Sequence, residues 1–142
     1  NTTALCLYGR IQTEQLQNYE EAKRYFQEAL AINIDAVAVY PYYLETLLLN
    51  EDFEEAAKLI DFALTIKGIN KMAILLKKVQ LLERQQDIKG AIKLMKEVKL
   101  VSFANDTYEI DEVVNRLNAK KDLLKPKKKS KKKKSEKKGK KK

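Results

Sequence analysis

Histidine is missing from this 142-residue chain, and there is a single cysteine, Cys6. Histidine is the commonest acid–base residue in enzymes and a common metal ligand, so its absence removes the usual means of proton transfer and metal binding. One cysteine without histidine builds no structural zinc site and no disulfide within the chain, which favours a reducing compartment. Cys6 stands among apolar residues and reads as a buried small side chain. We therefore expect no catalysis, no metal and no other cofactor, and a cytoplasmic or nuclear location.

Glycine and proline are also scarce, with 4 and 2 copies, and tryptophan is absent. Long helices contain few of these residues, whereas turn-rich β-folds need them. No run approaches the roughly 18 consecutive apolar residues that cross a bilayer, so we expect no membrane span. Apolar residues make up 44% of the chain, which is enough for a packed core. The composition predicts an all-α fold.

Charge is divided unevenly along the chain. Residues 125–142 hold 13 Lys and one acidic residue, whereas residues 1–124 hold 16 basic and 19 acidic residues. The net charge of +9 therefore combines a mildly acidic body, at −3, with a strongly basic tail, at +12. The two parts call for separate functional interpretations.

Three segments of the body repeat one pattern, and they align on Ala22, Ala56 and Ala91 at intervals of 34 and 35 residues. Large apolar residues stand three positions before each alanine and four positions after it, and a smaller apolar residue stands seven positions after it. These offsets fall on one face of an α-helix, where alternating large and small side chains let a neighbouring helix pack closely. The predicted packing residues are Tyr19, Ala22, Phe26, Ala29, Phe53, Ala56, Ile60, Ala63, Ile88, Ala91, Met95 and Val98.

Each repeated segment begins with a helix start signal. Asn18, Asp52 and Asp87 are short polar residues whose side chains can accept hydrogen bonds from the first free backbone N–H groups of a helix. Another apolar helix precedes each copy, and Pro41 is compatible with the second of these only near its start. These preceding helices are expected at roughly residues 3–16, 38–50 and 71–85.

A helix–turn–helix unit of about 34 residues resembles the tetratricopeptide repeat (TPR) family. The twelve packing residues carry the resemblance, which covers about residues 3–103, and Gly9 resembles the small residue of the family's first helix. The spacing from Gly9 to Ala22 is one residue longer than usual, which predicts a distorted first turn. The resemblance implies a right-handed α-solenoid. It places repeats at about 3–34, 38–68 and 71–103 in a domain of residues 1–124.

A further helix is expected at about residues 106–124. Asp106 and Glu109 resemble a capping box at its start, and Pro126 disfavours its continuation past Leu124. One face of this helix carries an apolar stripe and the opposite face is polar, as in the helices that cover the exposed ends of solenoids. The apolar stripe consists of Ile110, Val113, Val114, Leu117 and Leu124.

The resemblance also implies a concave groove lined by the first helix of each repeat. Its mixed apolar and acidic lining would suit a peptide or amphipathic helix of some basic character. Any single leucine of this set is more often a core residue than a groove residue. The candidate groove residues are Leu7, Ile11, Glu14, Glu45, Leu48, Leu49, Leu76, Gln80, Glu83 and Arg84.

The N-terminal helix carries apolar residues that nothing in this sequence covers, among them Leu7, Tyr8 and Ile11. We expect either further repeats upstream in a longer parent or self-association at this end. The tyrosines of the body read as packing residues, because the surrounding charge is acidic and repels phosphates.

The lysine tail, residues 125–142, has no apolar residue to bury and is predicted to be disordered. It is either an inert solvated tail, a sequence-independent contact for RNA or another polyanion, or a nuclear address; the last two together are favoured. The candidate polyanion-binding residues are Lys127, Lys128, Lys129, Lys131, Lys132, Lys133, Lys134, Lys137, Lys138, Lys140, Lys141 and Lys142.

Two functions compete on the sequence. The first is a non-catalytic scaffold or adaptor that binds a protein partner, a peptide or an amphipathic helix, in the groove, with the tail for polyanion contact or targeting. The alternative is an RNA- or ribosome-associated protein in which the tail is the main binding element and the repeats mediate assembly.

Overall fold

Seven α-helices and no β-strand make up the described part of the chain, which in this computed structural model comprises residues 1–101 and 107–124. The all-α prediction is confirmed for these residues. None of the helices found there is long and apolar enough to cross a membrane. In chain order the helices are α1 (Thr2–Glu14), α2 (Tyr19–Ile32), α3 (Val39–Leu49), α4 (Phe53–Ala63), α5 (Lys71–Arg84), α6 (Ile88–Val101) and α7 (Thr107–Leu123).

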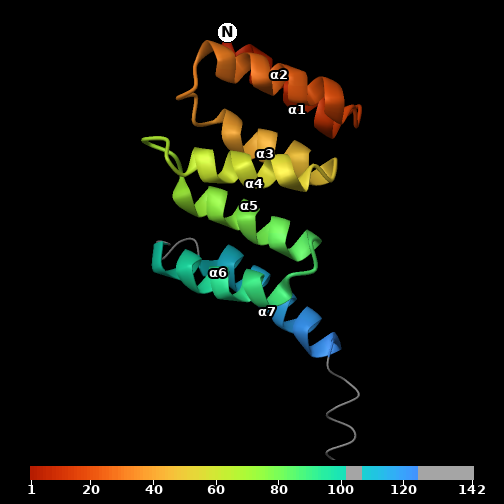
Figure 1. The fold of residues 1–142 in the computed structure, drawn as a ribbon, viewed down its shortest axis with the longest axis vertical. Helices are drawn as coiled ribbons and strands as arrows, with labels where there is room; N and C mark the ends of the chain where they lie inside the picture. Colours follow the sequence, from red (N-terminus) through yellow and green to blue (C-terminus); the bar gives the residue numbers. More distant parts are fainter. Residues whose placement is uncertain (102–106, 125–142) are drawn as a thin grey trace, which may run out of the picture.

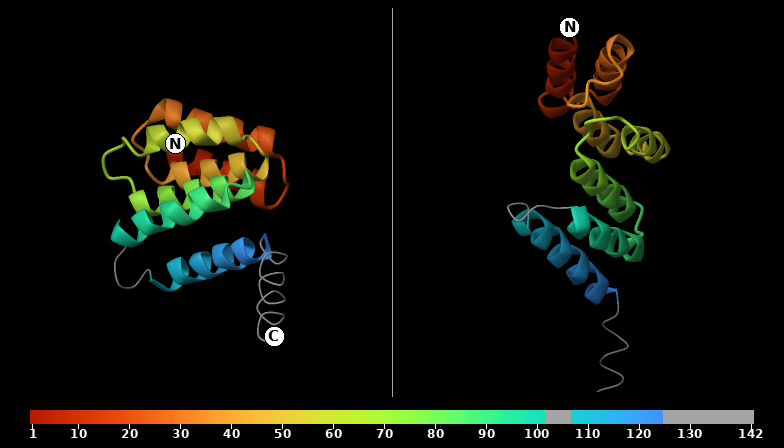
Figure 2. Two further views of the ribbon diagram at one scale, coloured as in Figure 1. Left: turned by 60° about the horizontal axis from the view of Figure 1, so that its bottom comes forward. Right: turned by 90° about the vertical axis from the view of Figure 1, so that its left-hand side faces the viewer.

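The helices stack in chain order along the long axis of the molecule (Figure 1). Each helix packs against the next one in sequence, with α1 and α2 at one end and α6 and α7 at the other. In addition, α1 packs against α3, and α3 packs against α5. The odd-numbered helices α1, α3 and α5 therefore form a row of direct neighbours, and the turned views show the same stepwise arrangement (Figure 2).

The turn inside each helix pair has the same backbone signature. Gln17, Glu51 and Gln86 have φ values of 51°, 60° and 66°, in the left-handed region that non-glycine residues seldom adopt. They stand 34 and 35 residues apart, as the three repeated segments do. The following backbone N–H closes the turn, and in the second and third copies its acceptor lies five residues back. In the first copy Asn18 reaches six residues back, to Gln12, so the extra residue predicted there enlarges this turn.

All three repeated helices begin at the residue after the predicted cap, and two of the three cap side chains form the expected hydrogen bond. The side chains of Asn18 and Asp87 each accept a hydrogen bond from the backbone N–H three residues further on, at 3.4 and 3.0 Å. Asp52 stands at the N-cap of α4, as predicted, but its side chain forms no capping hydrogen bond; its carboxylate accepts instead from Lys23 Nζ at 3.1 Å and from Asn50 Nδ2 at 2.7 Å. Asn70, which the sequence reading did not single out, caps α5.

The twelve predicted packing residues lie on the inner faces of α2, α4 and α6. Ten of them are buried, and Tyr19 and Phe53 are partly buried. Gly9 of α1 faces the buried Phe26 ring so closely that a Cβ atom built on Gly9 would lie 2.7 Å from Phe26 Cε1. The small residue of the first helix therefore leaves the room that the Phe26 ring of α2 occupies.

Two hydrophobic cores meet at α5. The larger core is formed by α1 to α4 and receives Ile74 and Leu81 of α5. The smaller core joins α6 and α7 to Leu76 and Val79 of the same helix. Because α5 contributes side chains to both cores, it connects the N-terminal and C-terminal parts of the stack.

The C-terminal helix α7 closes the smaller core with Ile110 and Leu117, whose side chains are buried. Leu124 is 72% exposed, so its assignment to the apolar stripe is wrong, since the helix has ended by that residue. The proposed capping box at Asp106 and the lysine tail, residues 125–142, lie outside the described residues.

Candidate binding groove

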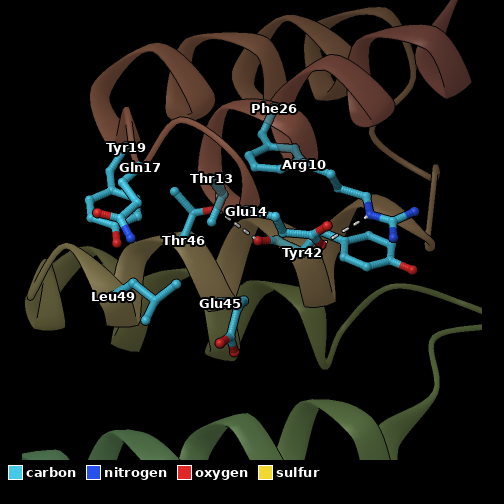
Figure 3. A pocket seen from close by; sticks show the side chains of 10 residues that line it. All are labelled: Arg10, Thr13, Glu14, Gln17, Tyr19, Phe26, Tyr42, Glu45, Thr46 and Leu49. Carbon is cyan, nitrogen blue, oxygen red and sulfur yellow. Dashed lines mark hydrogen bonds and ion pairs between the residues drawn. The ribbon is translucent and has the colours of Figure 1, made fainter.

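Three hollows adjoin one another along the row formed by α1, α3 and α5. The central hollow has a volume of about 340 Å³ and is shown in Figure 3. It shares Arg10 and Tyr42 with an N-terminal hollow of about 600 Å³, and it shares Glu45 with a C-terminal hollow of about 630 Å³. All three are open to solvent rather than enclosed, and we refer to the three adjoining hollows together as the groove.

The central hollow lies between α1 and α3. Thr13 and Thr46 are buried and face each other with their Oγ atoms 2.7 Å apart, which joins the two helices by a hydrogen bond (Figure 3). Nearer the surface, the Arg10 guanidinium lies over the Tyr42 ring, 4.2 Å from its centroid. Glu14 Oε1 is 3.6 Å from Arg10 Nε. The hollow therefore has a fixed polar floor and a cation stacked on an aromatic ring at its rim.

The N-terminal hollow is the most apolar of the three. It lies between the first half of α1 and the segment that joins α2 to α3, and its lining includes Cys6, Leu7, Ala36, Val37 and Val39. Cys6 is buried, as predicted. Burial raises the pKa of its thiol, and the charge of Arg10 opposes this only in part. The raised pKa favours the neutral thiol, and Cys6 forms part of the wall of this hollow.

The C-terminal hollow is lined by charged residues of α5 and α7. Glu83 is 8% exposed, and its carboxylate accepts hydrogen bonds from Arg116 at 3.0 Å and from Lys120. Burial alone would raise the pKa of Glu83, but these two donors outweigh it and lower the pKa. At the border with the central hollow, Lys77 Nζ lies 2.5 Å from Glu45 Oε2. These ion pairs connect α3 to α5 and α5 to α7.

Seven of the ten predicted groove residues line the three hollows. They are Leu7, Glu14, Glu45, Leu49, Gln80, Glu83 and Arg84. Ile11 is 40% exposed on α1 but lies outside the three hollows. Leu48 and Leu76 were wrongly placed in the groove, because both are buried in the two cores.

The sequence predicted a mixed apolar and acidic groove lining for a partner of some basic character, but the acidic residues of the groove lie next to cations of the protein. Each predicted acidic lining residue has a cationic partner in the protein: Glu14 has Arg10, Glu45 has Lys77, and Glu83 has both Arg116 and Lys120. The carboxylates expected to attract a basic partner are therefore already compensated. Sequence reasoning missed these pairs because, apart from the i,i+4 pair of Arg10 and Glu14, the partners are more than 30 residues apart.

A second surface feature lies on α6. Lys89, Lys93 and Lys96 are exposed, and their spacing of four and three residues places them on one side of the helix. Within the part of the chain that the structure describes, none of these three side chains forms an ion pair. The corresponding outer positions of α4 are occupied by Glu54, Lys58 and Asp61, and Lys58 forms an ion pair with Glu54.

No family model matches the chain, and no curated protein matches it. Among residues 1–101 and 107–124, no three His, Cys, Asp or Glu side chains are grouped so that they could hold a metal ion.

Proposed function

We propose that the chain is a non-catalytic adaptor of the TPR type, a right-handed α-solenoid that binds a peptide or amphipathic helix of a protein partner along the groove. Three repeats and a capping helix would make up the solenoid. Supporting this assignment are the recurring left-handed turn residues at Gln17, Glu51 and Gln86. The burial of the repeated packing residues and the row of contacts α1–α3–α5 support it as well.

The observation that carries the proposal is that three open hollows adjoin one another along α1, α3 and α5. An extended peptide or a single helix contacts its receptor over several neighbouring side-chain sites, whereas a small molecule is held in an enclosed pocket. Here the hollows share lining residues and follow successive first helices, so one elongated ligand can occupy all three. Their apolar walls and fixed charges supply both affinity and direction.

Peptide selection on the full chain tests this proposal. Peptides enriched from a random displayed library would be measured by fluorescence anisotropy against the wild type, Leu7→Glu and Leu100→Glu. Leu7 is 51% exposed in the N-terminal hollow, whereas Leu100 is 87% exposed on α6 and lines none of the three hollows. We expect Leu7→Glu to weaken binding about tenfold or more, since it places a charge on an apolar contact. Equal binding by all three proteins would contradict groove binding.

Polyanion binding is a second candidate function, and the lysine row on α6 favours it. Lys89, Lys93 and Lys96 place positive charge on the folded body, in addition to the 13 lysines within residues 125–142 of the sequence. Lysine contacts to phosphates release counterions, so affinity for a polyanion falls steeply with salt. The tail and the row would then act together on RNA or a similar ligand.

Filter binding of a single-stranded RNA oligonucleotide at several salt concentrations tests this function. The proteins compared would be the full chain, residues 1–124, and a full chain with Lys89, Lys93 and Lys96 all changed to Gln. We expect the triple variant to lower the slope of log K against log salt by about 2. The truncated chain should bind far more weakly than the full chain. Equal binding by the full and truncated chains would exclude the tail as the binding element.

A further inference from the structure

Net charge distinguishes α6 from α2 and α4, which are the second helices of the other two pairs. Four lysines and one glutamate give α6 a net charge of +3, whereas α2 carries −1 and α4 carries −2. Every cationic side chain of α2 and α4 forms an ion pair with a carboxylate. The lysine row of α6, which consists of Lys89, Lys93 and Lys96, has no ion-pair partner among the described residues. Its positive charge is therefore available to a ligand.

Leu100 continues the lysine row toward the end of α6. It follows Lys96 by four residues, a spacing that places it on the same side of the helix as the row. Its side chain is 87% exposed, more than any other large apolar side chain of the described residues. Leu123 and Leu124 come next, at 75% and 72%, and they stand at the end of α7, the helix that packs on α6. This end of the stack thus combines unpaired cations with exposed apolar side chains (Figure 1).

The leucine in line with the lysines favours an anionic bilayer over a nucleic acid as the ligand of α6. Both ligands attract lysines through their phosphate groups. Single-stranded nucleic acids also stack their bases on aromatic side chains, and α6 contains none. Leu100 gains nothing from the phosphates of RNA, whereas at a bilayer its side chain can leave water for the boundary between headgroups and acyl chains.

We infer that α6 binds the surface of an anionic bilayer, with the lysine row against the lipid headgroups and Leu100 at the boundary of the acyl chains. The helix lies on the bilayer and does not cross it. The 13 lysines within residues 125–142 add to the attraction, because an anionic surface attracts a polybasic segment. This inference rests on the second candidate function, polyanion binding, and names the polyanion that α6 contacts. It does not depend on the groove.

Co-sedimentation of the full chain with lipid vesicles tests the inference. The vesicles consist of phosphatidylcholine, with or without about 30% phosphatidylserine as the anionic lipid. The row variant changes all three lysines of the row to Gln. Its matched control changes Lys58, Lys67 and Lys71 to Gln, which removes the same charge from exposed residues outside α6. A third variant, Leu100→Ser, removes the apolar contact alone.

We expect the wild type to bind only the vesicles that contain phosphatidylserine. The row variant should bind them about tenfold or more weakly, since each lysine near an anionic surface strengthens binding about fivefold. The matched control should stay within about twofold of the wild type, because its lysines lie outside the contact. Leu100→Ser should weaken vesicle binding about fivefold and leave the affinity for single-stranded RNA unchanged.

Tryptophan fluorescence locates the contact on the protein. Because the chain contains no tryptophan, Leu100→Trp introduces a single indole at the proposed contact. Its emission should move to shorter wavelengths when phosphatidylserine vesicles are added, since the indole leaves water for the bilayer interface. Leu16→Trp is the control, at a residue that is 61% exposed and lies between α1 and α2 at the other end of the stack. Its emission should not change.

Three results would overturn the inference while leaving polyanion binding standing. One is equal vesicle binding by the row variant and its matched control, and another is unchanged emission of Leu100→Trp on vesicles that it binds. The third is a wild type that binds RNA but no vesicle, in which case a loss of RNA binding in the row variant would assign the row to nucleic acid. If the wild type binds neither phosphatidylserine vesicles nor RNA, the inference and the second candidate function fail together.

Discussion

At the residue scale, Gly9 explains how α1 approaches α2. Its missing Cβ leaves room for the Phe26 ring, which is fully buried in the larger core. The corresponding residues of the second and third repeats, Leu44 and Val79, are buried but have full side chains. The close contact is therefore a property of the first repeat, whose turn is also one residue longer.

Gly9→Ala should destabilise the protein although alanine is the better helix former. Forcing a Cβ against Phe26 costs about 1–3 kcal/mol, which exceeds the gain of about 1 kcal/mol in helix propensity. Urea unfolding followed by circular dichroism gives the change. The cost should shrink in a Phe26→Leu background, where the opposing ring is absent. An increase in stability of the single variant would show that the helices separate without cost.

At the element scale, Lys23 joins α2 to α4. It is 9% exposed, and its ammonium group lies 3.1 Å from Asp52 and 3.5 Å from Glu55, with Glu20 of its own helix at 3.7 Å. Burial would lower the pKa of Lys23, but the hydrogen bond to Asp52 and the three negative charges outweigh it and raise the pKa. The Asp52 carboxylate accepts from both Lys23 and Asn50, and it forms no capping hydrogen bond to the first turn of α4.

Lys23→Met should lower the free energy of unfolding at pH 7 by about 1–2 kcal/mol, a discounted value because the carboxylates are partly exposed. Lys58→Met is the matched control. Lys58 and its partner Glu54 are 79% and 89% exposed, so that pair contributes at most about 0.5 kcal/mol.

The pH dependence of the difference in unfolding free energy between the wild type and Lys23→Met provides a second check. Because the pKa of Lys23 is higher in the folded than in the unfolded state, its ammonium charge stabilises the fold fully at pH values below the unfolded-state pKa of about 10.4. This stabilisation is lost as the pH rises through the pKa of the folded state. The stability difference between the wild type and Lys23→Met should therefore narrow at pH 11. A difference that stays constant from pH 7 to pH 11 would contradict a role for the ammonium charge.

At the scale of the whole molecule, α5 holds the two cores together and Glu83 holds α7 against α5. The acceptor is nearly buried, while its donors Arg116 and Lys120 are about half exposed. The end of the stack thus depends on one carboxylate in addition to the apolar contacts of Ile110 and Leu117.

Glu83→Gln should loosen α7, with a loss of about 1–2 kcal/mol at pH 7. Because the pKa of Glu83 is lower in the folded than in the unfolded state, its carboxylate stabilises the fold fully at pH values above the unfolded-state pKa of about 4.3. This stabilisation is lost as the pH falls through the pKa of the folded state. Hydrogen exchange of α7 amides, with urea unfolding at pH 7 and pH 3, measures both effects. Glu97→Gln, at an exposed residue of α6, is the control and should leave α7 protection unchanged.

Helix positions and inner faces were predictable because they depend on short-range regularities. The offsets around Ala22, Ala56 and Ala91 identified the buried faces, and the spacing after Gly9 identified the longer first turn. Leu48 and Leu76 were misplaced because helical phase alone does not say which side of α3 faces the larger core or which side of α5 faces the smaller one. The prediction that Leu124 belongs to the apolar stripe was wrong because α7 ends at Leu123, so Leu124 no longer lies on the buried face of a helix.

The sequence by itself determined seven helical segments, a 34–35-residue period and the separation of an acidic body from a lysine-rich tail. These follow from periodicity and composition, which act between neighbours in the chain. Only the tertiary structure decided the chemistry of the groove. It brought Lys77 to Glu45, Arg116 and Lys120 to Glu83, and Tyr42 beneath Arg10. Such partners lie about 30 residues apart, and helix packing rather than local pattern selects which charges are compensated.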